Sequence, residues 1–131
     1  MSIRQVWIVG LFLLVGGMGT FFSGVAVADK IAGNPVVGTY DVVGTNPMDN
    51  SPYEGVATVT KQGEALRIMF QIDGKSEAGV GILDNNVLAV SWIFEKKPTV
   101  LLMYPSRDGG WYGQWAYNKD TRLGSETWTR R

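Results

Sequence analysis

Short segments in which apolar and polar residues alternate dominate the chain after residue 35, and turn residues separate them. The clearest covers residues 65–73, where Leu, Ile, Phe and Ile occupy every second position. A period of two places these apolar side chains on one face of a β-strand, whereas an amphipathic helix repeats about every 3.6 residues. Asp73-Gly74 follows, and glycine accepts the positive φ that a two-residue hairpin turn requires. The pattern predicts an all-β fold.

Eight such segments follow one another at near-even spacing. They are expected at residues 36–43, 53–61, 65–73, 76–83, 87–94, 99–104, 111–117 and 123–129. Because most connections are short, neighbouring strands must run antiparallel. Closure removes the exposed edges of such a sheet, and about eight strands leave an interior that side chains just fill or that holds one small ligand. The sequence predicts a small up-and-down β-barrel, with a two-sheet sandwich as the alternative.

The N-terminus has the pattern of a secretory signal peptide. One positive charge, Arg4, precedes an uncharged run at residues 6–27. Ala26-Val27-Ala28 then provides small residues at the two positions that signal peptidase reads. We expect cleavage after Ala28. The alternative is an uncleaved helix that anchors the chain in the inner membrane, because the uncharged run approaches the ~20 residues of a spanning helix.

Three segments follow from this pattern. They are a signal peptide at residues 1–28, a short linker at 29–35 and a β-barrel domain at 36–131. The expected location is secreted or periplasmic. The membrane is an expected partner only through the first segment, if that segment stays uncleaved.

Composition and charge exclude several classes of function. The chain has 12 basic and 12 acidic residues, and one base lies within residues 1–28, which leaves 11 − 12 = −1 for the remainder. This balance argues against nucleic acid as a partner, which requires clustered Lys and Arg. The absence of Cys and His excludes a Ser-His-Asp triad, a Cys nucleophile and a Cys/His zinc site. We therefore predict no metal or cofactor, and a protein that is not an enzyme.

Four aromatic residues are candidate ligand-binding residues: Tyr40, Trp92, Trp111 and Trp115. On inward-facing strand positions they would line a barrel mouth and stack on a small ligand. The alternative is that they fill the core, since Tyr and Trp are ordinary strand residues.

Two groups of polar residues are further candidate sites. The connection at residues 44–52 carries oxygen side chains that suit a calcium ion, but only Asp49 is charged there, which favours a solvated turn. Asp108, Glu126 and Arg107 contain the carboxylates and cation of an acid–base site. Nothing in the sequence brings them together, so we interpret them as surface charges.

Two resemblances to known families rest on short motifs. The G-T-Y at residues 38–40, the G-T-N-P at 44–47, the Y-E-G at 53–55 and the L-G-S-E at 123–126 resemble a family of small exported bacterial β-proteins, often labelled fibronectin-binding. The W-Y-G-Q-W at 111–115 is similar to a strand of avidin-type barrels, and the G-T-Y is similar to the G-x-W opening of avidins and lipocalins. The first resemblance implies export, and the second implies an up-and-down barrel.

These observations favour an exported, non-enzymatic binding module. Its barrel mouth or a loop surface would contact a small apolar ligand or an extracellular or envelope protein. The alternative is a structural envelope protein without a discrete ligand. A carboxylate-based hydrolase is disfavoured, because no recognisable catalytic spacing occurs.

Cleavage of the signal peptide after Ala28 would fix the first residue of the exported protein. Edman sequencing of the exported protein should start at Asp29, because the small residues at positions 26 and 28 direct cleavage there. A chain that retains Met1 would contradict cleavage and support the membrane anchor.

Overall fold

The computed structural model describes residues 35–118 and 120–131. The signal peptide predicted at residues 1–28 and residues 29–34 of the predicted linker lie outside these ranges. Within them, no helix is long and apolar enough to cross a membrane.

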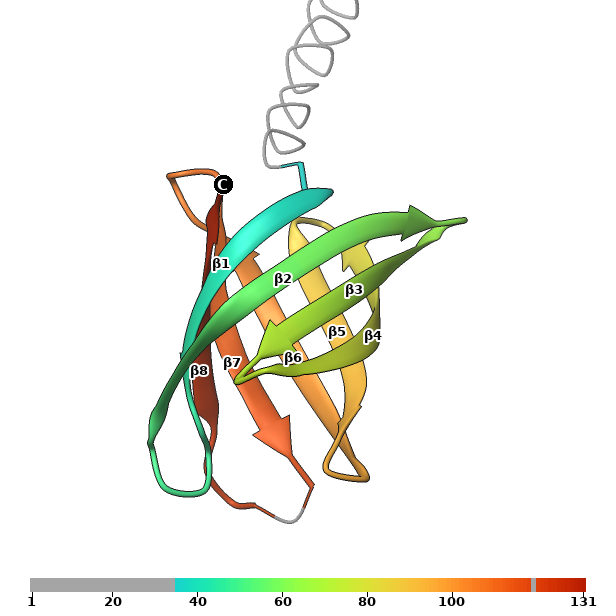
Figure 1. Ribbon diagram of the computed structural model, residues 1–131. Coiled ribbons are helices and arrows are strands. Elements are labelled where there is room, and N and C mark those ends of the chain that lie inside the picture. Colours follow the sequence, from blue (N-terminus) through green and yellow to red (C-terminus); the bar gives the residue numbers. More distant parts are fainter. Residues whose placement is uncertain (1–34, 119) are drawn as a thin grey trace, which may run out of the picture. The chain divides into compact units, whose positions relative to one another are not determined.

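Eight antiparallel strands form one closed barrel (Figure 1). They are β1 (Gly38–Thr45), β2 (Pro52–Gln62), β3 (Ala65–Ile72), β4 (Lys75–Asp84), β5 (Val87–Phe94), β6 (Lys97–Pro105), β7 (Trp111–Tyr117) and β8 (Gly124–Arg130). Each strand pairs with its predecessor, and β8 returns to pair with β1. The predicted up-and-down barrel is therefore confirmed, and the alternative sandwich is not the fold.

Alternation along the strands fills the barrel interior. The strand β3 buries Leu66, Ile68 and Phe70, whereas Arg67 between them is exposed. The strand β7 buries Trp111 and Trp115 on the same face, as a period of two requires. All buried apolar side chains join in one hydrophobic cluster inside the barrel.

The strand β4 places glycine inside and its apolar residues outside. Val80 and Ile82 are exposed, whereas Gly81 is buried. A Cβ atom at Gly81 would lie 2.7 Å from the Cδ1 atom of Ile68 on the neighbouring strand, too close for a real contact. Large side chains of β3 and β5 therefore occupy the space that β4 leaves open.

Tight turns connect the paired strands. Asp73 and Gly74 both have positive φ, at 52° and 75°, as a type I′ hairpin turn requires. Asn85 and Asn86 repeat this conformation, in agreement with the tolerance of Asn for the left-handed region.

One end of the barrel, here called the covered end, is closed by the residues that precede β1. The hydroxyl of Tyr40 donates a hydrogen bond to the carbonyl of Val36 at 2.7 Å. The guanidinium of Arg130 lies 4.8 Å from the ring centroid of Tyr40 and donates to the carbonyls of Val37 and Pro35. These contacts hold residues 35–37 against the barrel, so the first strand begins at Gly38 rather than at the predicted residue 36.

Gly113 provides a test of the close strand packing. A Cβ atom there would lie 1.8 Å from the carbonyl oxygen of Leu102. We expect Gly113→Ala to lower the free energy of unfolding by about 1–3 kcal/mol, since overpacking forces the backbone to move. Urea unfolding followed by tryptophan fluorescence measures this change. The control is Gln114→Ala, an exposed neighbour expected to stay within about 0.5 kcal/mol of wild type. Equal stability of the two variants would contradict the packing described here.

Candidate functional site: a cavity at the open end of the barrel

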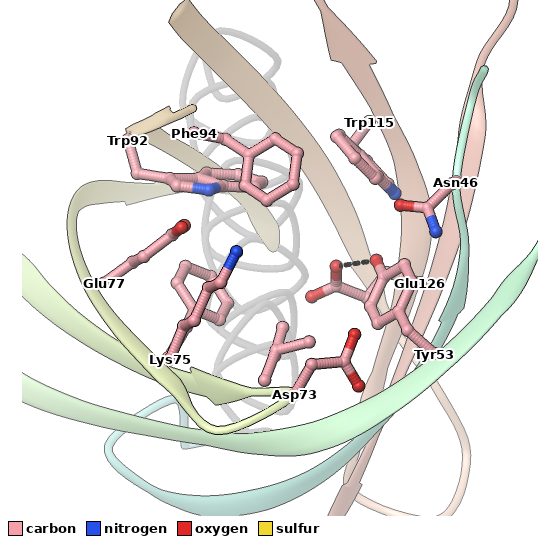
Figure 2. A pocket seen from close by; sticks show the side chains of 11 residues that line it. Asn46, Tyr53, Asp73, Lys75, Glu77, Trp92, Phe94, Trp115 and Glu126 are labelled. Atoms are coloured by element: carbon pink, nitrogen blue, oxygen red, sulfur yellow. Dashed lines mark hydrogen bonds between the residues drawn. The ribbon is translucent and has the colours of Figure 1, made fainter. Parts of the chain in front are cut away.

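A cavity of about 90 Å³ lies inside the barrel at the end opposite the covered end (Figure 2). Its residues come from the last part of β3, β5 and β7, the first part of β2, β4 and β8, and the β1–β2 and β3–β4 loops. Antiparallel order brings all of these to one end, here called the cavity end. The lining residues are Asn46, Tyr53, Phe70, Ile72, Asp73, Lys75, Glu77, Trp92, Phe94, Trp115 and Glu126.

Aromatic rings form one wall of the cavity. The ring centroids of Trp92 and Trp115 lie 5.9 Å apart, and the ring of Phe94 meets that of Trp115 edge-on at 6.2 Å. The indole nitrogen of Trp115 donates to the carbonyl of Thr45 at 3.2 Å, which fixes the ring orientation. The wall is therefore apolar, and its rings hold one another in place.

A buried carboxyl group lies at the cavity floor. The side chain of Glu126 accepts a hydrogen bond from the hydroxyl of Tyr53 at 2.5 Å through one oxygen. Its other oxygen accepts from the indole nitrogen of Trp128 at 2.5 Å. Glu126 is only 2% exposed, and burial raises the pKa of its carboxyl group even though both hydrogen bonds act to lower it. Burial and the nearby carboxylate also raise the pKa of the Tyr53 hydroxyl.

Glycine makes the contact between Tyr53 and Glu126 possible. Gly44 on β1 pairs with Tyr53 on β2 and also with Glu126 on β8. The ring of Tyr53 crosses over Gly44, where a Cβ atom would lie 2.3 Å from the Cζ atom of the ring. Gly113 pairs with Glu126 on the other side. The carboxyl group is thus flanked by two strands that carry no side chain at its level.

The β3–β4 hairpin brings charged groups to the cavity. Lys75 and Glu77 lie on the inward face of β4, and Asp73 precedes them in the turn. Figure 2 shows the Lys75 side chain extending into the cavity. Burial raises the pKa of Glu77, although Trp92 and the charge of Lys75 oppose the shift. With Glu126, the lining has three carboxyl groups and one ammonium group, or 1 − 3 = −2 when all are ionised.

The four predicted aromatic residues divide between the two ends of the barrel. Trp92 and Trp115 line the cavity, whereas Tyr40 and Trp111 are completely buried in the core toward the covered end. A role of the first pair in ligand binding stays a prediction. The second pair packs in the hydrophobic core, and its role in ligand binding also stays a prediction.

Sequence reasoning missed Glu126 as a buried group and interpreted it as a surface charge. Glu126 lies two residues before the buried Trp128 on β8, so both side chains point inward. This spacing in the sequence indicates the burial of Glu126. Asp108, its proposed companion, lies in the β6–β7 turn at the other end of the barrel, where it accepts a hydrogen bond from the backbone of Gly110.

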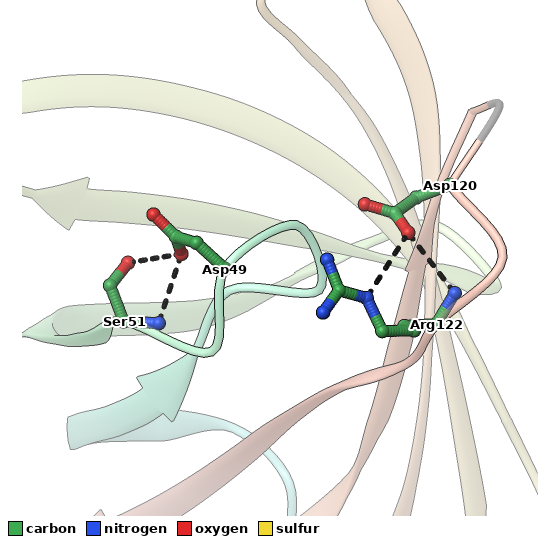
Figure 3. A network of polar contacts seen from close by, with 4 residues as sticks. All are labelled: Asp49, Ser51, Asp120 and Arg122. Carbon is green, nitrogen blue, oxygen red and sulfur yellow. Dashed lines mark hydrogen bonds and ion pairs between the residues drawn. The ribbon is translucent and has the colours of Figure 1, made fainter.

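The β1–β2 connection, where the sequence offers oxygen side chains for a calcium ion but favours a solvated turn, forms a self-contained polar turn (Figure 3). Asp49 accepts hydrogen bonds from the hydroxyl of Ser51 at 2.6 Å and from its backbone at 2.9 Å, and these bonds lower the pKa of Asp49. Nearby, Asp120 and Arg122 form an ion pair at 3.9 Å. Among residues 35–118 and 120–131, no cluster of three metal-ligating side chains of the His, Cys, Asp or Glu type occurs.

A second surface of interest lies on the outside of strands β4 to β7. The register places Val80 and Val100 on either side of Ser91, and Ile82 and Leu102 on either side of Ala89. This outer apolar face consists of the exposed side chains of Val80, Ile82, Ile93, Val100, Leu102, Tyr104 and Tyr112. Exposed apolar patches often mark contacts with other macromolecules.

The raised pKa of Glu126 predicts a pH-dependent stability. A buried acid whose pKa is raised stabilises the fold fully below its unfolded pKa, about 4.3, and this contribution is lost as the pH rises through the folded value. We compare wild type with Glu126→Gln by urea unfolding between about pH 4 and pH 8. The stability advantage of wild type should shrink as the pH rises, by at most about 1.4 kcal/mol per pH unit. An advantage that grows with pH would show that folding favours the carboxylate instead.

Comparison of the sequence with protein-family models and with curated proteins gives no match. Among solved structures, the chain is similar to a Schistosoma mansoni fatty acid binding protein in complex with arachidonic acid. The TM-score is 0.48 at 11% identity, and the alignment covers 72% of this chain and 95% of that chain.

Proposed function

We propose that this chain is an exported, non-enzymatic binding protein that holds a small, largely apolar molecule at the cavity end of its barrel. The observation that carries the proposal is the cavity itself, with an aromatic wall on one side and a buried polar group at its floor. Ligand sites in proteins combine these features, because apolar walls supply affinity and a few fixed polar groups supply orientation.

The volume limits the size of the ligand. A cavity of roughly 150 Å³ in another protein holds one benzene molecule. The volume here, about 90 Å³, therefore suits a compact group such as part of a ring or a short alkyl chain. A longer ligand would place its remainder at the mouth, beside the β3–β4 hairpin.

The chemistry of the floor supports binding rather than catalysis. Both oxygens of Glu126 already accept hydrogen bonds, from Tyr53 and from Trp128. A general acid or base must instead reach the proton that it transfers. The chain also has no His or Cys to act as a nucleophile or a base at neutral pH.

The outer apolar face supports a second candidate, a structural or envelope protein that contacts another protein and has no discrete ligand. Export, in either case, is inferred from the signal-like pattern at residues 1–28.

Native mass spectrometry of the mature protein, purified from its own envelope without denaturation, tests the proposal. We expect a mass that starts at Asp29 together with an added small molecule. Ile72→Phe fills part of the cavity and should reduce the retained fraction, because Ile72 lies in its lining. The matched control is Val80→Thr on the outer apolar face, which should retain the molecule. A bare protein in every preparation would contradict a carrier role and favour the second candidate.

A further inference from the structure

We propose that the cavity selects an organic cation, in which an ammonium group is carried on a small apolar body. This inference rests on the proposed function, since it names the class of ligand that the same cavity takes. Four features of the described residues carry it: the charge of the lining, the aromatic wall, the position of Lys75 and the burial of Glu126.

The charge of the lining opposes an anion. Asp73 and Glu77 lie on either side of Lys75 along the β3–β4 hairpin, and all three line the cavity. An anionic group that approached Lys75 would therefore meet two carboxylates as well. Glu77 is half-buried, and its charge is screened less than a charge on an open surface, whereas Asp73 and Lys75 are exposed, so this discrimination should weaken as the salt concentration rises.

The aromatic wall suits a cation. Indole rings attract ammonium groups through their electron-rich faces, more strongly than Tyr or Phe rings do. Elsewhere in this barrel, cations of the chain lie over rings: Arg130 over Tyr40 at 4.8 Å, and Lys97 over Tyr117 at 5.2 Å. Within the part of the chain that the structure describes, no such cation lies over Trp92 or Trp115.

Lys75, an exposed residue of the hairpin, already presents an ammonium group to the cavity. Its side chain extends inward from β4 and shares the cavity with Glu77 and Glu126 (Figure 2). A ligand ammonium would compete with that of Lys75 for Glu77, the carboxyl group whose pKa the Lys75 charge acts to lower. Removal of the Lys75 charge should consequently strengthen the binding of a cation rather than weaken it.

The burial of Glu126 predicts how binding responds to pH. A cation near the floor would favour the ionised form of this carboxyl, so binding should strengthen as the pH rises through its raised pKa. The other titratable groups that face the same cavity are Tyr53, Asp73, Lys75 and Glu77. The pKa of Glu77 is also raised, so its ionisation should likewise strengthen the binding of a cation as the pH rises.

Three probes with the same propyl body and different charge, small enough for the cavity, test the inference: propylammonium, 1-propanol and butanoate. Each is titrated into the full mature protein, and the indole N–H resonances of Trp92 and Trp115 are followed by NMR. We expect the ammonium probe to bind about tenfold more tightly than the alcohol, and the carboxylate to bind more weakly than either.

Substitutions that remove one charge from the cavity separate an effect on ligand selectivity from an effect on folding. Glu77→Gln should weaken the binding of the ammonium probe several-fold and leave the binding of the alcohol unchanged. Lys75→Met should strengthen the binding of the ammonium probe. Glu54→Gln is the matched control, because Glu54 is exposed on the outside of β2 next to Tyr53. Opposite effects of the two cavity variants on binding cannot come from unfolding, because unfolding would weaken the binding of all three probes.

The outcomes distinguish this inference from the proposed function. If the alcohol and the carboxylate bind as tightly as the ammonium probe, the cavity is a ligand site but the selection of cations is overturned. If none of the three probes shifts the resonances of Trp92 and Trp115, both the inference and the cavity as a ligand site are overturned.

Discussion

The limited volume inside a closed eight-stranded barrel is the constraint on which the rest of this structure depends. Such an interior is just wide enough for side chains to fill it. Here, ring contacts run from Tyr40 to Trp128, from Trp128 to Phe70 and from Phe70 to Trp92. At the cavity end, glycine on a neighbouring strand gives the rings room, since Trp92 pairs with Gly79, Trp115 with Gly124 and Tyr53 with Gly44. Glycine at these inward positions is therefore part of what lets the rings of the cavity end fit.

The same constraint produces the candidate site. Because Gly44 leaves space on β1, the Tyr53 hydroxyl reaches across a whole strand to Glu126. Trp115 similarly crosses Gly124 to reach the carbonyl of Thr45. Each aromatic side chain is thereby fixed by a hydrogen bond at its polar edge, and its apolar surface remains available to the cavity.

Both ends of the barrel hold a cation of the chain over a tyrosine ring, Arg130 over Tyr40 at the covered end and Lys97 over Tyr117 at the cavity end. At the covered end, Arg130 lies over Tyr40 and also holds residues 35–37, so the cation and its ring belong to the same chain. At the cavity end, carboxyl groups and indole rings lie together, and Lys75 is the only cationic side chain in the lining. Among the described residues, no cation of the chain lies over Trp92 or Trp115, so these two rings suit a cation that comes from outside the chain.

The sequence predicted the strands and the barrel, because alternation and turn residues are local signals. The segment at residues 65–73 and the Asp73-Gly74 turn illustrate this, since neither depends on distant contacts. The position of a strand residue along the barrel axis is not local. Trp92 and Trp111 have equivalent patterns in the sequence, yet only Trp92 reaches the cavity. The burial of Glu126 similarly depends on register with β1 and β7, which no single segment specifies.

A crystal structure of the protein purified without denaturation is the most direct test of the central claim, that the cavity end holds a ligand. The account predicts non-protein density in the cavity, against the rings of Trp92 and Trp115 and beside the carboxyl group of Glu77. A cavity that contains only water or the Lys75 side chain, with density or a partner chain on the outer apolar face instead, would contradict it.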